Sequence, residues 1–363
     1  MLSHAAAVDR DLRPARAVLE AAGARAVLLF APEHGFDATA QDMVSIDHAR
    51  GEIPIQSLYG ERFEDLSPDP TRLVGLDLVV VDLVDVGSRY YTFVWTALLT
   101  LQAAARAGVP VLVLDRPNPI GGVNVEGAPN RPGFTSFVGL EPVAVRHGMT
   151  IGETLRLCAA RRGFSRSLEV LPMQGWSRDR PFDCADVPWV QPSPNMPTRD
   201  TALVYPGACL VEATNASEGR GTTRPFEIVG APWIDGPALA RRLDSEKLPG
   251  VRFRPLAFEP TFHKHAGRRC GGVQIHPTDR DAFRPYRTGL ALIAALREIG
   301  GDAFEWRREP YEFVADIPAI DLLTGGDEVR RAVESGAKVD DVLEALRPQE
   351  DAFRAERTEY LLY

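Results

Sequence analysis

Three apolar segments near the start of the chain each end at side chains that could carry out acid–base chemistry. The segments 26–30, 78–81 and 111–114 are followed, in order, by Glu33 and His34, by Asp82, Asp85 and Arg89, and by Asp115 and Arg116. A carboxylic acid beside an imidazole suits proton transfer to a leaving group. A guanidinium can bind a substrate carboxylate through two parallel hydrogen bonds. If the fold brings these groups together, they predict an enzyme acting on an anionic substrate.

The three segments have the pattern of strands in a parallel sheet. Continuous aliphatic runs are typical of strands buried on both faces. The strand at 77–83, a helix at 93–106 and the strand at 110–114 form a βαβ unit. In an open parallel sheet the carboxyl ends of the strands share one edge, and ligands bind there. We therefore expect an α/β fold with the polar groups converging on one cleft.

Several further side chains fit the same cleft, and each also has a purely structural interpretation. Tyr90 could stack on a sugar ring or fill the core, and Arg89 could bind a substrate or pair with Asp85. Arg116 and Asn118 lie in a proline-rich loop that could aim them at a ligand, although an Asp115–Arg116 pair could equally tie the loop down. Two further candidates precede a helix N-terminus, where the helix dipole favours anions: Arg146 and His147.

The densest polar segment of the chain is 212–222. Its Gly-Arg-Gly core lacks the lysine and spacing of a phosphate-binding loop, and Ser217 lacks the glycine of a nucleophile elbow. We interpret Glu212, Asn215 and Arg220 as hydrogen-bonding groups for a hydroxyl-rich, anionic ligand. Glu218 is either a second carboxylate of the site or a helix cap.

Composition limits the possible functions. A net charge of −9 argues against sequence-independent nucleic-acid binding, and no apolar stretch is long enough to span a membrane, which predicts a soluble protein. The four cysteines are widely spaced, and the pair His263 and His265 lacks a third ligand in range, so no metal site is predicted.

The sequence carries no signal for an oligomeric state. No signal peptide is visible, which predicts a cytoplasmic protein; an export signal ahead of this N-terminus would instead predict a secreted or periplasmic one.

The texture of the sequence changes near residue 225. Two half-exposed strands at 250–256 and 272–276 follow, with helices expected near 285–298, 327–335, 339–346 and 350–358. We expect a Rossmann-like parallel-sheet domain over 1–225 and a smaller α+β domain over 226–363.

With these segments in view, the chain resembles the exo-β-N-acetylmuramidase family of bacterial peptidoglycan hexosaminidases, formerly a domain of unknown function. The resemblance rests on nine segments that occur in the same order over nearly the whole chain: Pro-Glu-His-Gly-Phe at 32–36, Ser-Leu-Tyr-Gly at 57–60, Asp-Val-Gly-Ser-Arg-Tyr-Tyr-Thr at 85–92, Leu-Asp-Arg-Pro-Asn-Pro at 114–119, Ser-Phe-Val-Gly at 136–139, Arg-His-Gly-Met-Thr-Ile-Gly-Glu at 146–153, Pro-Ser-Pro-Asn-Met-Pro-Thr at 192–198, Glu-Ala-Thr-Asn-Ala-Ser-Glu-Gly-Arg-Gly-Thr at 212–222 and Tyr-Leu-Leu-Tyr at 360–363. The segment 192–198 adds Asn195 to the binding candidates. The segment 37–42 departs from the family, which usually has an arginine and a Gly-Glu pair there.

The resemblance implies a catalytic domain without a nucleotide cofactor and a C-terminal auxiliary domain. It also implies hydrolysis of β-linked N-acetylmuramic acid from the non-reducing end of peptidoglycan-derived muramyl saccharides. Family members are often exported. In the family, the glutamate of Pro-Glu-His-Gly is the leading catalytic candidate, which corresponds to Glu33 here.

Our hypothesis is that Glu33, beside His34, protonates the departing glycosidic oxygen. Glycosidases usually need a second carboxylate, for which the candidates are Asp85, Glu212 and Glu218; the acetamido group of the sugar could also serve. We expect one of four arginines to bind the lactyl carboxylate of muramic acid: Arg89, Arg116, Arg146 or Arg220. Two alternatives are a metal-assisted hydrolase using Glu33, His34 and Asp82 or Asp85, and a sugar-binding module without catalysis.

Overall fold

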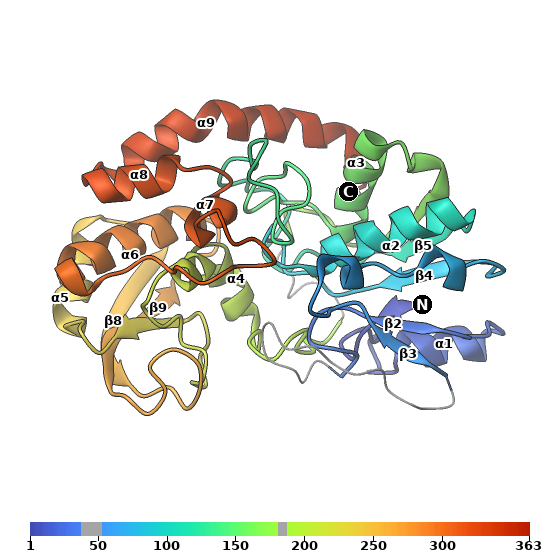
Figure 1. Cartoon of the computed structure of the whole chain (residues 1–363), viewed down its shortest axis with the longest axis horizontal. Coiled ribbons are helices and arrows are strands. Elements are labelled where there is room, and N and C mark those ends of the chain that lie inside the picture. The colour runs from blue at the N-terminus through green and yellow to red at the C-terminus, as the bar shows by residue number, and fades with distance from the viewer. Residues whose placement is uncertain (38–52, 181–186) are drawn as a thin grey trace.

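The computed structural model describes residues 1–37, 53–180 and 187–363, and Figure 1 shows two sheets lying side by side. In these residues the first sheet has six parallel strands in the order β3-β2-β1-β4-β5-β6. Their bounds are β1 Leu2–Ser3, β2 Leu29–Ala31, β3 Ile55–Ser57, β4 Val79–Asp82, β5 Val111–Leu114 and β6 Leu168–Leu171. The predicted α/β class is confirmed. The strands predicted at 26–30, 77–83 and 110–114 are also present, although each is shorter than predicted.

The two-residue strand β1 lies at the centre of this sheet. Leu2 is buried and pairs with Phe30 of β2 on one side and with Val81 of β4 on the other. From β1 the chain builds outward to β2 and β3, and then returns to build β4, β5 and β6 on the other side. The strand order therefore reverses between β1 and β4, the position at which open α/β sheets bind their ligands.

Helices α1 (Ala15–Ala21), α2 (Phe93–Ala107) and α3 (Ile151–Arg162) belong to this domain. Nearly all of α2 is buried, because it packs between the sheet and its neighbouring segments, and it ends at Gly108 in the left-handed conformation (φ 73°). Thr150 and Glu153 form a capping box at the start of α3, the helix expected after Arg146 and His147. The segment 116–149 is a long loop that contains neither a helix nor a strand.

The second sheet is antiparallel and has the order β7-β9-β8 in the described residues. Its strands are β7 Ile228–Ala231, β8 Val251–Phe258 and β9 Cys270–Pro277, and the accompanying helices are α5 Gly236–Ser245, α6 Pro285–Gly300, α7 Ala319–Thr324 and α8 Glu328–Ser335. The predicted α+β character is confirmed. Helix α4 (Arg199–Ala208) also packs against α6, where Gly207 faces Gly289 so closely that a side chain on either would meet backbone.

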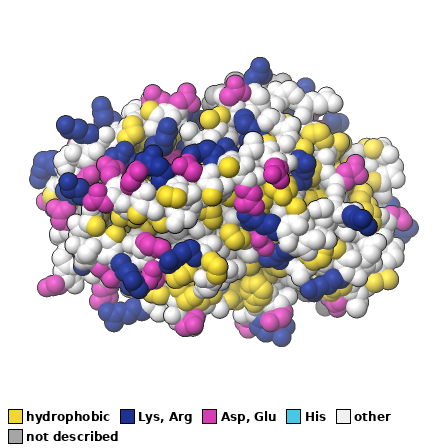
Figure 2. All heavy atoms as spheres, turned by 90° about the horizontal axis from the view of Figure 1, so that it is seen from above, with side chains coloured by type: hydrophobic (Ala, Val, Ile, Leu, Met, Phe, Trp, Pro, Cys, Tyr) yellow, Lys and Arg dark blue, Asp and Glu magenta, His cyan; other side chains and the backbone are white. Residues whose placement is uncertain are grey.

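A single helix replaces the two that we predicted at the C-terminus. Helix α9 runs from Val339 to Glu356 and contains Pro348, which lies on its exposed side. Water can satisfy the carbonyl that the proline leaves without a donor, so the helix continues through it. Figure 1 shows α9 arching from the second domain to the first, and Figure 2 shows acidic and basic side chains interspersed on the face that it crosses.

Two buried arginines join the domains through backbone carbonyl groups. Nη1 of Arg89 donates to the carbonyls of Ala128 and Val143, and Nη2 donates to Leu323 in α7, at 2.6–2.9 Å. Arg357, which follows α9, donates to four carbonyls of the 116–149 loop, those of Gly122, Val123, His147 and Gly148. The chain end then returns to the first domain, where the Tyr363 hydroxyl donates to Asp115.

We expect Arg89→Lys to lower the free energy of unfolding by roughly 3 kcal/mol, because an ammonium group cannot reach three carbonyls in these directions and buried acceptors lose their donors. Urea unfolding measures the change. The matched control is Arg106→Lys, since Arg106 is exposed on α2. Equal midpoints for the two variants would contradict the role assigned to Arg89.

Candidate active site

A narrow cavity lies where the carboxyl end of β2 meets the second domain. Six of the residues singled out in the sequence line it, and they come from distant parts of the chain: Glu33, His34, Tyr90, Asn195, Glu212 and Arg220. The free space is about 30 Å³, which admits water, and a saccharide ring must displace side chains to enter. The convergence expected at the edge of the sheet is therefore present for these residues.

Glu33 occupies the first-domain side of the cavity. Its side chain is buried, and Oε2 accepts a hydrogen bond of 2.6 Å from the hydroxyl of Thr92, the residue that precedes α2. The rigid, buried α2 thus fixes the carboxyl group of the β2 loop. A buried carboxyl group is suited to act as an acid, because loss of water disfavours the carboxylate form.

Uncommon backbone conformations are concentrated around this cavity. His34 (φ 70°), Phe226 (φ 61°) and Glu312 (φ 47°) line it in the left-handed region, and Phe313 (φ 68°) follows. Residues with a Cβ adopt this region only where the surrounding structure holds them there. Such strain is typical of functional sites, where it fixes side chains that would otherwise point elsewhere.

The second-domain side presents one carboxylate held by two donors. Oε1 of Glu212 accepts from Nη2 of Arg220 at 2.7 Å, and Oε2 accepts from the hydroxyl of Tyr311 at 2.8 Å. The Arg220 guanidinium also lies over the ring of Phe226, 5.1 Å from its centroid. Glu212, Arg220 and Tyr311 thus form a hydrogen-bonded wall of the cavity that Glu33 also lines.

Glu218 is a structural anion behind this wall. It is fully buried and interacts with Nζ of Lys264 at 3.0 Å, Nδ1 of His263 at 3.2 Å and Nε of Arg220 at 3.4 Å. Burial alone would raise the pKa of Glu218, but these cations together hold it well below its ordinary value. Glu218 is outside the set of residues that line the cavity. Its position supports a role in holding the 212–222 loop rather than the catalytic role considered for it.

Asp85 and His147 form a second buried group that also does not reach the cavity lining. Oδ2 of Asp85 accepts from the Gly87 amide at 2.7 Å and lies 3.9 Å from Nε2 of His147. Burial, the largest cause, raises the pKa of Asp85 to about 7 and lowers that of His147 to about 3. Asn118 lies nearby and donates to the Met149 carbonyl. These positions do not support the catalytic or binding roles proposed for the three residues.

The remaining binding candidates contact protein groups. Arg116 pairs with Asp82, and Arg146 pairs with Glu126 at 2.9 Å. The amide of Asn215 donates to the Ala303 carbonyl and accepts from the Glu305 amide. Of the four arginines considered for the lactyl carboxylate, Arg220 is the one that lines the cavity in the described residues. An arginine at a strand end can bind a backbone carbonyl or a carboxylate of the protein as readily as a substrate. Arg89, Arg116 and Arg146 bind such protein groups.

Several lining residues were not among the candidates from the sequence: Thr92, Tyr205, Phe226, Tyr311 and Glu312. Thr92 ends the segment 85–92 that carries the family resemblance, whereas Tyr311 and Glu312 belong to an irregular segment without a motif.

Within 1–37, 53–180 and 187–363, no three histidine, cysteine or carboxylate side chains are grouped so that they could hold a metal ion. Cys158, Cys209 and Cys270 are buried and form no disulfide with one another. Cys184 lies outside the described residues, as do positions 38–42 of the divergent segment. No helix in the described parts combines the length and apolar character needed to cross a membrane.

Comparison with known proteins gives matches along the full chain. The family models for the N-terminal and C-terminal parts of exo-β-N-acetylmuramidase NamZ match residues 1–200 and 203–363. The peptidoglycan β-N-acetylmuramidase NamZ of Bacillus subtilis (strain 168) is 40% identical over 368 residues, which cover 100% of this chain and 86% of that protein.

Two crystal structures of DUF1343-family proteins from Bacteroides fragilis NCTC 9343 have the same fold. One has a TM-score of 0.88 at 29% identity and covers 100% of this chain and 93% of its own. The other has a TM-score of 0.76 at 26% identity, with 100% and 92% covered. The predicted domain boundary at 225 stays a prediction, while the family models divide the chain between 200 and 203. Taken with the motifs and the cavity, these matches show that the chain belongs to the NamZ exo-β-N-acetylmuramidase family.

Proposed function

We propose that this protein is an exo-acting β-N-acetylmuramidase that releases N-acetylmuramic acid from the non-reducing end of peptidoglycan fragments. The observation that carries the proposal is that Glu33, Glu212 and Arg220 line one cavity. Glu33 belongs to the part of the chain that the N-terminal family model matches, and Glu212 and Arg220 belong to the part that the C-terminal model matches. Paired carboxyl groups are the usual machinery of glycosidases. The name of the B. subtilis relative supports the choice of substrate.

In the proposed reaction Glu33 is the general acid. Its proton passes to the glycosidic oxygen as the bond from that oxygen to the anomeric carbon breaks, and the shortened glycan leaves. Thr92 orients the carboxyl group through its hydrogen bond to Oε2. Water later adds to the anomeric carbon and returns a proton to the site.

Glu212 is the proposed partner. Two donors, Arg220 and Tyr311, each give a hydrogen bond to one of its carboxylate oxygens. An anion at this place stabilises the positive charge that develops on the sugar ring. It can act on the anomeric carbon directly, or it can support attack by the sugar's own acetamido group.

Arg220 is the proposed reader of the lactyl carboxylate. Nη2 of Arg220 binds Glu212 and Nε lies 3.4 Å from Glu218, and the residue lines the cavity. A guanidinium matches a carboxylate through two hydrogen bonds, which a neutral glucosamine analogue cannot accept in the same way.

For Glu33→Gln we expect turnover of a chromogenic β-N-acetylmuramide to fall by roughly 10²–10⁴-fold, because the amide cannot supply the proton. Muramic acid should still bind, as measured by calorimetry. A variant with ordinary turnover would remove Glu33 from the mechanism. Wild-type protein that binds muramic acid without releasing the chromophore would identify a sugar-binding module instead.

Glu212→Gln and Glu218→Gln form a matched pair that separates chemistry from stability. The first should lower kcat strongly with little change in melting temperature. The second should lower the free energy of unfolding by about 3 kcal/mol, since it removes the anion from among Lys264, His263 and Arg220. The folded fraction of Glu218→Gln should keep its kcat; the opposite pattern would exchange the two assignments.

Arg220→Lys should lower kcat/KM on the muramide about tenfold to hundredfold more than on the corresponding N-acetylglucosaminide, because a point charge cannot replace the bidentate contact. Arg116→Lys is the control, since its partner is Asp82. Equal losses on the two substrates for Arg220→Lys would show that this arginine acts through Glu212 and does not read the lactyl group.

A further inference from the structure

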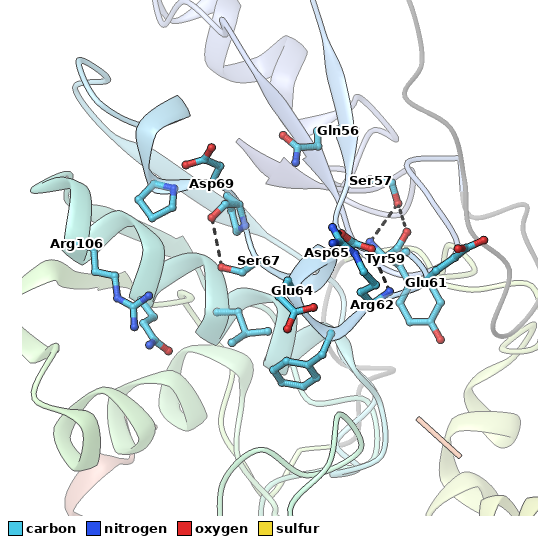
Figure 3. A pocket seen from close by; sticks show the side chains of 16 residues that line it. Gln56, Ser57, Tyr59, Glu61, Arg62, Glu64, Asp65, Ser67, Asp69 and Arg106 are labelled. Atoms are coloured by element: carbon cyan, nitrogen blue, oxygen red, sulfur yellow. Dashed lines mark hydrogen bonds and ion pairs between the residues drawn. The ribbon is translucent and has the colours of Figure 1, made fainter. Parts of the chain in front are cut away.

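An open hollow of about 820 Å³ lies at the end of β3, the strand next to β2, which leads to Glu33. It is bounded by the end of β3, by the segment 59–70 and by α2. Figure 3 shows polar side chains around it, including those of Gln56, Glu64, Asp69 and Arg106. The function proposed above gives this hollow no role.

The register of the parallel sheet places the hollow beside the catalytic acid. Ala31 of β2 pairs with Ser57 of β3, and the Leu58 amide donates to the Ala31 carbonyl at 2.8 Å. Neighbouring strands lie about 4.8 Å apart. Glu33 is two residues beyond Ala31, and Tyr59 is two residues beyond Ser57. The two loops therefore leave the sheet side by side, one into the cavity and the other into the hollow.

An aromatic cluster of Tyr59, Phe63, Phe137 and Phe313 connects the two spaces. The Phe313 ring lies 6.0 Å from Tyr59, 6.2 Å from Phe63 and 6.3 Å from Phe137, measured between centroids. The chain neighbours of Phe137 and Phe313, namely Val138 and Glu312, line the Glu33 cavity. Tyr59 and Phe63 line the hollow. The residues that line the hollow are thus linked through this cluster to those that line the cavity.

Phe63 keeps an exposed ring at this wall. Its exposed fraction is 43%, whereas Tyr59 and Phe137 are buried. An exposed aromatic ring beside carboxylate and amide groups offers an apolar face to a sugar ring and acceptors to its hydroxyls. Acidic side chains outnumber basic ones in the lining, with Glu61, Glu64, Asp65 and Asp69 against Arg62 and Arg106. Such a lining suits a neutral sugar better than a muramic acid carboxylate.

We propose that the hollow binds the leaving side of the glycan, with its N-acetylglucosamine residue against Phe63, while the terminal muramic acid occupies the Glu33 cavity. The inference rests on the proposed function. An enzyme that removes one terminal sugar needs an enclosed place for that sugar and an open one for the remaining chain. The narrow cavity and the wide hollow have these two shapes.

The test compares kcat/KM on two substrates for the wild type, Phe63→Ala, Glu64→Ala and the control Leu171→Ala. Leu171 is an exposed apolar side chain on β6, the opposite edge strand of the same sheet. One substrate is the chromogenic β-N-acetylmuramide, which has no leaving-side sugar. The other is a tetrasaccharide of alternating N-acetylmuramic acid and N-acetylglucosamine, with muramic acid at its non-reducing end.

We expect Phe63→Ala to lower kcat/KM on the tetrasaccharide about tenfold, because the stacking surface is lost, and to leave the chromogenic substrate within twofold of wild type. Glu64→Ala should show the same selectivity with a smaller loss, and Leu171→Ala should change neither value. Equal effects on both substrates, or no effect on either, would overturn the leaving-side assignment. Wild-type protein that cleaves neither substrate would overturn the proposed function itself, which the variants cannot mimic.

Discussion

The burial of guanidinium groups against backbone carbonyls is the interaction on which the site depends. Arg89 ties two segments of the 116–149 loop to α7, and Arg357 ties the end of α9 to the same loop. A charge that is buried without acceptors costs several kcal/mol, so these contacts leave the domains little freedom to separate. Glu33 comes from the part matched by the N-terminal family model, and Glu212 and Tyr311 come from the part matched by the C-terminal model. The relative position of the residues that line the cavity is therefore fixed by arginines that lie outside it.

Different interactions hold the two sides of the cavity in place. On the first-domain side, Thr92 restrains Glu33 and the left-handed backbone of His34 sets the direction of the loop. On the other side, Glu218 contacts Lys264, His263 and Arg220, and these contacts hold the 212–222 loop in place. Arg220 connects the two anions, because it contacts both Glu218 and Glu212. One anion stabilises the loop, and the other faces the space where the proposed chemistry takes place.

Much of the parallel sheet could be predicted because its signal is local. The aliphatic runs that form β2, β4 and β5, the cap of α3 and the carboxyl-edge placement of Glu33 depend on neighbouring residues in the sequence. The break we expected within α9 was wrong, since an exposed Pro348 costs the helix less than its packing gains. In the second sheet, the start of β8 alternates in burial, and that period was also visible in the sequence. Strand β7 is buried throughout and was not predicted.

The division of polar residues between site and scaffold could not be predicted. Arg89, Arg116 and Arg146 follow strands or precede helices just as binding residues do, but their partners are set by segments far away in the chain. Glu212 and Glu218 are only six residues apart in the sequence. Their roles differ because Lys264 and His263, from a later loop, contact Glu218.

The most direct measurement is a crystal structure of the Glu33→Gln protein with a disaccharide of muramic acid linked to N-acetylglucosamine. We expect the glycosidic oxygen to lie within hydrogen-bonding distance of the side-chain amide of residue 33, and the lactyl carboxylate to lie on Arg220. A saccharide bound away from this cavity, or a lactyl group on another arginine, would contradict it.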